Sequence, residues 1–118
     1  MPIEATIIAY LNTAMEYPAY GDTPAKNVPP HRYLVRKTGG ICRDHIHTAL
    51  VAIQSITVQS MEMASGMNEA LIEAMRNLPA AEVSVSACRL NSDYESSAIN
   101  KKEYRYTAVF DVTYTREA

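Results

Sequence analysis

The C-terminal residues from Tyr104 to Arg116 alternate between apolar and polar side chains almost without exception. A period of two over this length predicts a β-strand with one buried face. At ~3.4 Å per residue the strand extends about 35–40 Å, well beyond the usual strand of five or six residues. A strand this long is open to edge-to-edge pairing, which an assembling protein can use. The apolar positions are Tyr104, Tyr106, Ala108, Phe110, Val112 and Tyr114.

Length and composition limit the class of protein. The 118 residues are typical of one domain, residues 1–118, and 47% hydrophobic with 20% charged content is typical of a soluble globular protein. The net charge of −2 disfavours a dedicated nucleic-acid or anionic-membrane binder. Because no apolar run reaches ~18 residues and no secretion signal opens the chain, we expect no membrane partner. Cys42 and Cys88 lie far apart and are predicted to be free thiols.

Two amphipathic helices are predicted. The first opens after Pro2 and stops near Glu16, before a second proline that disfavours helical geometry. The second runs from an N-cap at Ser60 to about Leu78, and Pro79 ends it. Its predicted buried face consists of Ala64, Met67, Leu71, Ala74, Met75 and Leu78.

The remaining periodic segments predict strands. His31–Lys37 is expected to be a strand that turns at Thr38–Gly40 and returns from Ile41. Residues 46–58 are β-branched and apolar on both faces, which favours a central strand. Residues 82–90 alternate and then change face, which indicates a bulged strand, whereas residues 91–103 are polar and aperiodic and are expected to form a loop.

These elements predict an α+β fold. The simplest way to cover every apolar stripe is to pack two helices on one face of a roughly four-stranded mixed or antiparallel sheet, with the long C-terminal strand inside it. Residues 17–30 are rich in Pro, Gly and Asp and are expected to form an arm or irregular loop. A short strand near Ala19–Tyr20 is an alternative for part of that segment.

The only spacing that suggests a metal is Cys42, Asp44, His45 and His47. Alternate strand residues share a face, so the two histidines would be able to chelate an ion together. A structural zinc site needs four convergent ligands, and the chain has no second cluster. The pattern therefore favours a solvated strand start or hairpin tip, with no metal and no cofactor.

No catalytic constellation is evident, and the protein is predicted not to be an enzyme. Neither cysteine has a base and an orienting partner in its surroundings. Glu69 and Glu73 are spaced for the exposed face of the second helix. Arg36 and Lys37 precede Thr38–Gly40, but a phosphate-binding loop would open onto a helix, and here a strand follows. We expect a tight turn whose charges face a partner.

The order of these segments resembles the tail-terminator and tail-completion proteins of long-tailed bacteriophages, also described as minor tail or minor capsid proteins. The resemblance covers nearly the full length. It is carried by IEATIIAYLNTAM, PPHRYLVRKTGG, ALVAIQSITVQSMEMASGMNEALIEAMRNLP and YRYTAVFDVTYTR. The Ile41–His47 passage departs from that pattern.

The resemblance implies a non-enzymatic structural protein of the virion tail, which assembles in the host cytoplasm. Such proteins form a homo-oligomeric ring, usually a hexamer, that ends tail-tube growth and joins the tube to neck or connector proteins. DNA would pass through the ring without specific binding. The alternatives are a neck or head–tail connector subunit and a small cytoplasmic ligand-binding or enzymatic α+β domain.

A ring needs two different patches that meet on adjacent copies. The polar side of the terminal strand, the arm and the basic turn offer such surfaces, and Met61 and Ile72 lie at the margin of a helix face. The predicted subunit interface consists of Tyr20, Arg36, Lys37, Thr38, Gly39, Gly40, Met61, Ile72, Arg105 and Asp111.

Overall fold

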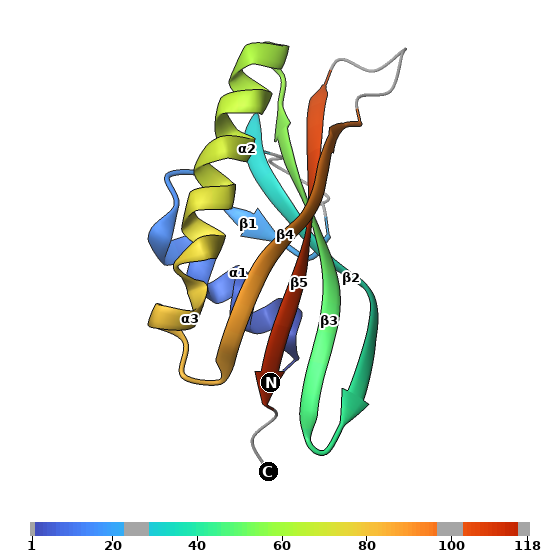
Figure 1. Ribbon diagram of the computed structural model, residues 1–118. Coiled ribbons are helices and arrows are strands. Elements are labelled where there is room, and N and C mark those ends of the chain that lie inside the picture. Colours follow the sequence, from blue (N-terminus) through green and yellow to red (C-terminus); the bar gives the residue numbers. More distant parts are fainter. Residues whose placement is uncertain (1, 23–28, 97–102, 116–118) are drawn as a thin grey trace.

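The computed structural model describes residues 2–22, 29–96 and 103–115 (Figure 1). The described part is elongated, with extents of 45 × 26 × 22 Å. Its elements in chain order are α1 (Ile3–Ala14), β1 (Ala19–Tyr20), β2 (His31–Arg43), β3 (Ile46–Thr57), α2 (Met61–Arg76), α3 (Leu78–Ala81), β4 (Val85–Glu95) and β5 (Tyr104–Thr115).

The strands form one mixed sheet in the order β1-β2-β3-β5-β4. β1 pairs in parallel with β2, and the other neighbours are antiparallel. β3 and β5 lie at the centre and pair along their full length, from Ile46 opposite Thr115 to Thr57 opposite Tyr104. The predicted α+β class is confirmed, and so is the central position of β3. The strand beyond the expected four is the two-residue β1.

β5 confirms the alternation seen in the sequence. Ala108, Phe110, Val112 and Tyr114 are buried, whereas the side chains between them are partly exposed. The buried set packs under the helices because every second residue of a strand faces the same side. Arg116, the last residue of the predicted strand, lies outside the described residues.

α1 buries the stripe of Ile3, Ile7 and Leu11 against the sheet, at the helical spacing of four residues. It ends two residues before the position predicted for it. The Tyr10 hydroxyl donates a 2.6 Å hydrogen bond to the carbonyl of Ala74, which ties α1 to α2. The Asn12 side chain exchanges two hydrogen bonds with the backbone of Ala19, which fixes the start of β1.

α2 begins as predicted, because the Ser60 hydroxyl accepts a 3.1 Å hydrogen bond from the Met63 backbone. The predicted end at Leu78 is wrong. α2 stops at Arg76, and Leu78 and Pro79 open the short helix α3. Proline is accommodated in a first helical turn, since its missing N–H needs no partner there.

The predicted turn at Thr38–Gly40 is also wrong. These residues belong to β2, where the register with β3 shifts between Lys37 and Gly39. The chain instead turns at Asp44 and His45, whose φ angles of 50° and 67° suit a two-residue hairpin. Gly40 serves close packing, because a Cβ there would lie 3.1 Å from the carbonyl oxygen of Thr48.

β4 differs from its prediction at both ends. It starts at Val85 rather than Glu82, and it continues through Glu95, so residues 91–95 are strand and not loop. Hydrogen bonding to β5 holds this polar stretch, which has no apolar period because its side chains face solvent at a sheet edge. The pairing register of β4 with β5 shifts between Val85 and Ala87 and again between Leu90 and Ser92. These shifts agree with the bulged strand predicted from the sequence. Residues 97–102 of the expected loop lie outside the described residues.

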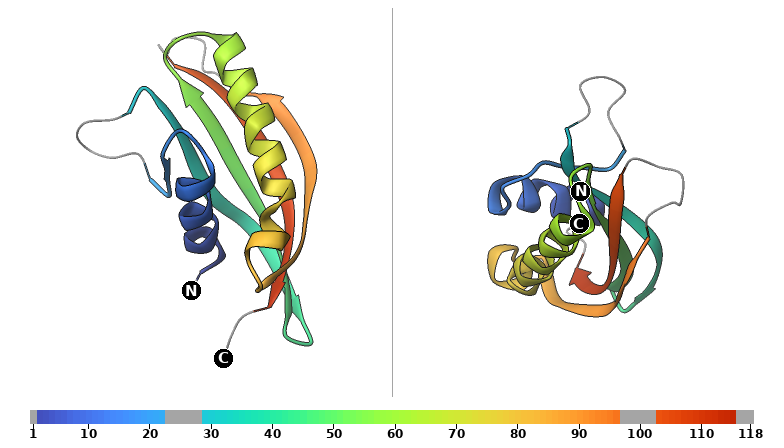
Figure 2. Two further views of the ribbon diagram at one scale, coloured as in Figure 1. Left: turned by 90° about the vertical axis from the view of Figure 1, so that its left-hand side faces the viewer. Right: turned by 90° about the horizontal axis from the view of Figure 1, so that it is seen from above.

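The predicted arm at 17–30 contains the short strand that was considered for it, at Ala19–Tyr20, while residues 23–28 lie outside the described residues. The two long helices cover the same face of the sheet (Figure 2). One core cluster joins α1, α2 and the inward residues of the strands. In the part of the chain that the structure describes, no helix packs on the opposite face, which we call the open face.

Candidate functional site

The segment that suggested a metal forms the tip of the β2–β3 hairpin. His45 lies in the turn and not in a strand, so the expectation that it shares a face with His47 is wrong. Cys42 and His47 are cross-strand partners, with Sγ 3.6 Å from Nε2. Among the residues described, no three His, Cys, Asp or Glu side chains converge on a metal position.

The two cysteines are free thiols in different surroundings. Cys42 is exposed on the hairpin, whereas Cys88 is partly buried under the helices. Burial, and to a lesser degree the charge of Asp111, raises the pKa of the Cys88 thiol to about 11. Cys88 is therefore protonated near neutral pH and is a poor nucleophile.

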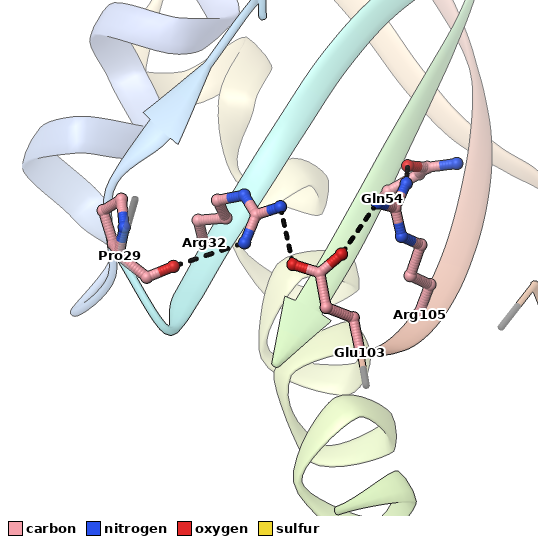
Figure 3. A network of polar contacts seen from close by, with 5 residues as sticks. All are labelled: Pro29, Arg32, Gln54, Glu103 and Arg105. Carbon is pink, nitrogen blue, oxygen red and sulfur yellow. Dashed lines mark hydrogen bonds and ion pairs between the residues drawn. The ribbon is translucent and has the colours of Figure 1, made fainter. Parts of the chain in front are cut away.

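One end of the open face is held by a polar network (Figure 3). Arg32 is only 2% exposed and donates to Glu103 at 2.9 Å and to the carbonyl of Pro29 at 3.3 Å. Arg105 donates to the other carboxylate oxygen of Glu103 and to Gln54, both at 3.0 Å. These side chains are engaged within the subunit, so the network is structural.

The pKa of Glu103 reflects that network. Burial raises it, but hydrogen bonds from Arg105 and Arg32, together with their positive charges, outweigh this effect and hold the pKa below its usual 4.5. Glu103 is therefore a poor general acid near neutral pH.

The far end of the open face carries exposed apolar side chains on the β2–β3 hairpin. Ile41 is 65% exposed and Ile46 is 50% exposed. Ile46 pairs with Arg43, and residues 41 and 43 point to the same side of β2. The hairpin extends past the helices that cover the other face (Figures 1 and 2). We call Ile41, Arg43 and Ile46 the hairpin tip.

A groove of about 770 Å³ lies on the other side of the molecule, between the C-terminal end of α1 and α2. Methionines and small residues form much of its wall, including Gly66, where an added Cβ would meet no atom of the described residues within 4 Å. We call it the methionine groove. Its lining consists of Ala14, Met15, Glu16, Tyr17, Tyr33, Gln59, Ser60, Glu62, Met63, Gly66, Met67, Ala70, Glu73, Ala74 and Asn77.

The groove has an acidic character. Glu16, Glu62 and Glu73 are exposed, and no Lys, Arg or His is found among the described residues that line the groove. Glu73 lies 3.4 Å from Arg76, outside the groove. Within the described ranges, Glu16 and Glu62 have no ion pair within 4.0 Å. The site thus combines a flexible apolar wall with negative charges at its margin, which suits an apolar group flanked by a cation.

The residues predicted for the interface do not form one patch. Arg36, Arg105 and Asp111 point to the open face, whereas Met61 and Ile72 belong to α2. Arg36 is exposed and lies 3.8 Å from Asp22, Arg105 belongs to the polar network, and Ile72 packs against the core. Tyr20 pairs with Leu34 at the sheet edge. Lys37, Thr38, Gly39 and Gly40 lie at the bulge of β2.

Sequence reasoning missed both the methionine groove and the apolar hairpin tip. The groove joins Met15 at the end of one helix to Met63 in another, and no local pattern links positions so far apart. The one sequence feature that hinted at the groove was Gly66. Glycine weakens a helix, and here its missing side chain leaves space along the groove wall. Ile41 and Ile46 lie on either side of Asp44-His45. Their exposure at the end of a hairpin can be inferred only when the turn is known to be at Asp44 and His45.

The chain matches no known protein-family model, and a search of curated proteins found no match either. No helix among the described residues is long and apolar enough to cross a membrane.

Proposed function

We propose that this protein is a non-enzymatic structural subunit of a phage or prophage tail. In this role it forms a ring at the head-proximal end of the tail tube, ends tube growth and joins the tube to the neck. The proposal is based on the resemblance in the order of the sequence segments.

The observation that carries the assembly role is the exposed apolar surface at the end of a long, open sheet. Ile41 and Ile46 are half or more exposed on a hairpin that extends beyond the helices. Burying these two side chains against a neighbouring subunit would remove apolar area from water and so favour association. The open face and the outer edge of β4 add strand surface that is available to neighbouring copies.

The methionine groove supports a second candidate, a small ligand-binding domain. Its volume of about 770 Å³ lies within the range of small-molecule sites. Its lining favours an apolar ligand with a positive charge. A neck or connector subunit of related fold is an alternative within the structural class.

Light scattering over a range of protein concentrations, followed by electron microscopy, tests the proposal. We expect a mass that rises with concentration toward a closed ring, rings with a central opening, and binding of those rings to one end of tail tubes. A protein that stays monomeric at every concentration and binds an apolar cation in the groove would instead support the ligand-binding alternative. Rings that bind the neck but not the tube would support a connector.

A further inference from the structure

The hairpin tip and the methionine groove have complementary surfaces. The tip presents two isoleucines beside the positive charge of Arg43. The groove presents methionine side chains, which adapt to the shape of an apolar group, beside the negative charges of Glu16 and Glu62. The apolar and charged parts of the two surfaces therefore match on the side of the hairpin that carries Arg43 and the isoleucines, whereas Asp44 lies in the turn beyond them.

A single copy cannot bring these two surfaces together. Tyr33 lines the groove, and its hydroxyl donates a 3.4 Å hydrogen bond to the carbonyl of Met67. Arg43 lies ten positions further along the same strand, β2. At ~3.3 Å per residue, this places the hairpin tip about 33 Å from the Tyr33 end of the groove, and Arg43 faces the opposite side of the sheet from the helices. Any contact between them must be made by two molecules.

We propose that the hairpin tip of one copy inserts into the methionine groove of the next copy. The contact joins two different patches, so it repeats from copy to copy and produces a closed ring when the rotation between subunits allows closure. This inference rests on the proposed function, for which it supplies the heterologous subunit contact. It places Ile41 and Ile46 against Met15, Met63 and Met67, and Arg43 near Glu16 and Glu62.

Site-directed cross-linking tests this contact directly. Cys42 is already exposed on the hairpin, and Cys88→Ser removes the second thiol. The substitution Ala70→Cys adds a thiol at the groove, whereas Glu69→Cys adds one at the adjacent position outside the groove lining. With a short bis-maleimide, we expect dimers and higher multimers from the Ala70→Cys protein and at least tenfold less product from the Glu69→Cys control.

Filling the groove gives an independent test. Gly66→Leu projects a side chain into open space and replaces a poor helix former, so the fold should keep its melting midpoint or gain a little. We expect self-association to weaken by about tenfold or more. Glu69→Leu adds the same side chain on the same helix outside the groove lining and should leave association within about twofold of the unmodified chain.

A charge exchange tests the polar part of the contact. Arg43→Glu should weaken self-association, and adding Glu62→Lys to the same chain should restore it at least partly. Both positions are exposed, so Arg43→Glu should leave the unfolding transition almost unchanged. Glu62→Lys puts a cation in the first turn of α2 and should lower the melting midpoint slightly, which the Glu62→Lys single variant measures. Restoration by the second change is not expected from a merely structural effect at either position.

The outcomes separate this inference from the proposed function. If rings form but neither Gly66→Leu nor Arg43→Glu affects them and only background cross-linking occurs, this contact is wrong while the ring proposal stands. If the contact is found but the rings do not bind tail tubes, the tail function is wrong while this inference stands. A chain that never self-associates overturns both. If the thiol introduced by Ala70→Cys captures a tail-tube protein instead of a second copy, the groove belongs to that partner and the inference is overturned.

Discussion

The guanidinium of Arg32 lies 2.9 Å from the carboxylate of Glu103, which fastens the start of β2 to the residue before β5. The arginine is 2% exposed and Glu103 is 23% exposed, so the pair is largely withdrawn from water. Among the residues that the structure describes, Nε of Arg32 has no hydrogen-bond partner, which leaves the guanidinium strongly dependent on Glu103 and on the Pro29 carbonyl. Removing one partner of such a pair leaves a buried charge without its counter-ion and is strongly destabilising. Replacing both partners with apolar residues usually costs much less stability.

Glu103→Ala should therefore lower the free energy of unfolding by about 2–3 kcal/mol, because it leaves a buried positive charge without its counter-ion. Urea denaturation at neutral pH measures this loss. Arg32→Met in the Glu103→Ala background removes the uncompensated charge and should recover part of the stability. Equal stability of Glu103→Ala and the unmodified chain would show that the pair contributes nothing.

The same contact predicts a pH dependence. The pKa of Glu103 is lowered in the folded state, so its contribution to stability is present above the usual value of 4.5 and is lost as pH falls through the folded pKa. The stability difference between the unmodified chain and Glu103→Gln should be largest near neutral pH and should shrink as the pH falls below 4.5. A difference that stays constant over this range would contradict the role given to the carboxylate.

The long elements were predictable because their patterns repeat. The alternation that ends at Tyr114 and the stripe through Ile7 and Leu11 each report one buried face over many residues. The end of α2 was less predictable, because Leu78 continues the apolar stripe while it already belongs to the next helix. Polar residues 91–95 form a strand through backbone pairing with β5, a cause that leaves no trace in side-chain periodicity.

The hairpin shows why a local signal can be misplaced. Gly39 and Gly40 suggest a turn, but strand pairing continues past them and Asp44-His45 adopts the positive φ angles instead. The register that decides between these positions is set by the long antiparallel pairing of β2 with β3. The hairpin tip and the groove both depend on such non-local placement, which is why the interface residues expected from sequence were scattered.

The turn itself offers a stabilising substitution. His45 has a φ of 67°, a conformation that costs an L-residue roughly 1 kcal/mol and glycine almost nothing. His45→Gly should raise the free energy of unfolding by about 1 kcal/mol. Thr48→Gly, in the extended strand nearby, should lower it by about the same amount. A loss of stability in the His45→Gly chain would show that the imidazole makes a contact worth more than the relieved strain.

The N-terminus of α2 can be tested in the same way. Ser60 accepts a hydrogen bond from the Met63 backbone, so Ser60→Ala should lower the unfolding free energy by about 1 kcal/mol. Ser60→Asp keeps an acceptor and adds a negative charge at the positive end of the helix, so it should be close to neutral. Thermal unfolding distinguishes the two variants. Equal losses would show that the side chain packs rather than caps.

The two thiols should differ sharply in their reaction with a disulfide reagent such as Ellman's reagent. Cys42 is exposed, whereas Cys88 is partly buried and its pKa is raised to about 11, so little thiolate forms near neutral pH. We expect one thiol to react rapidly in the folded protein and the second only after denaturant is added. Cys42→Ser should abolish the rapid phase, and Cys88→Ser should abolish the slow one. Rapid loss of both thiols without denaturant would mean that the layer of helices over β4 opens readily, since burial is what raises the pKa of Cys88.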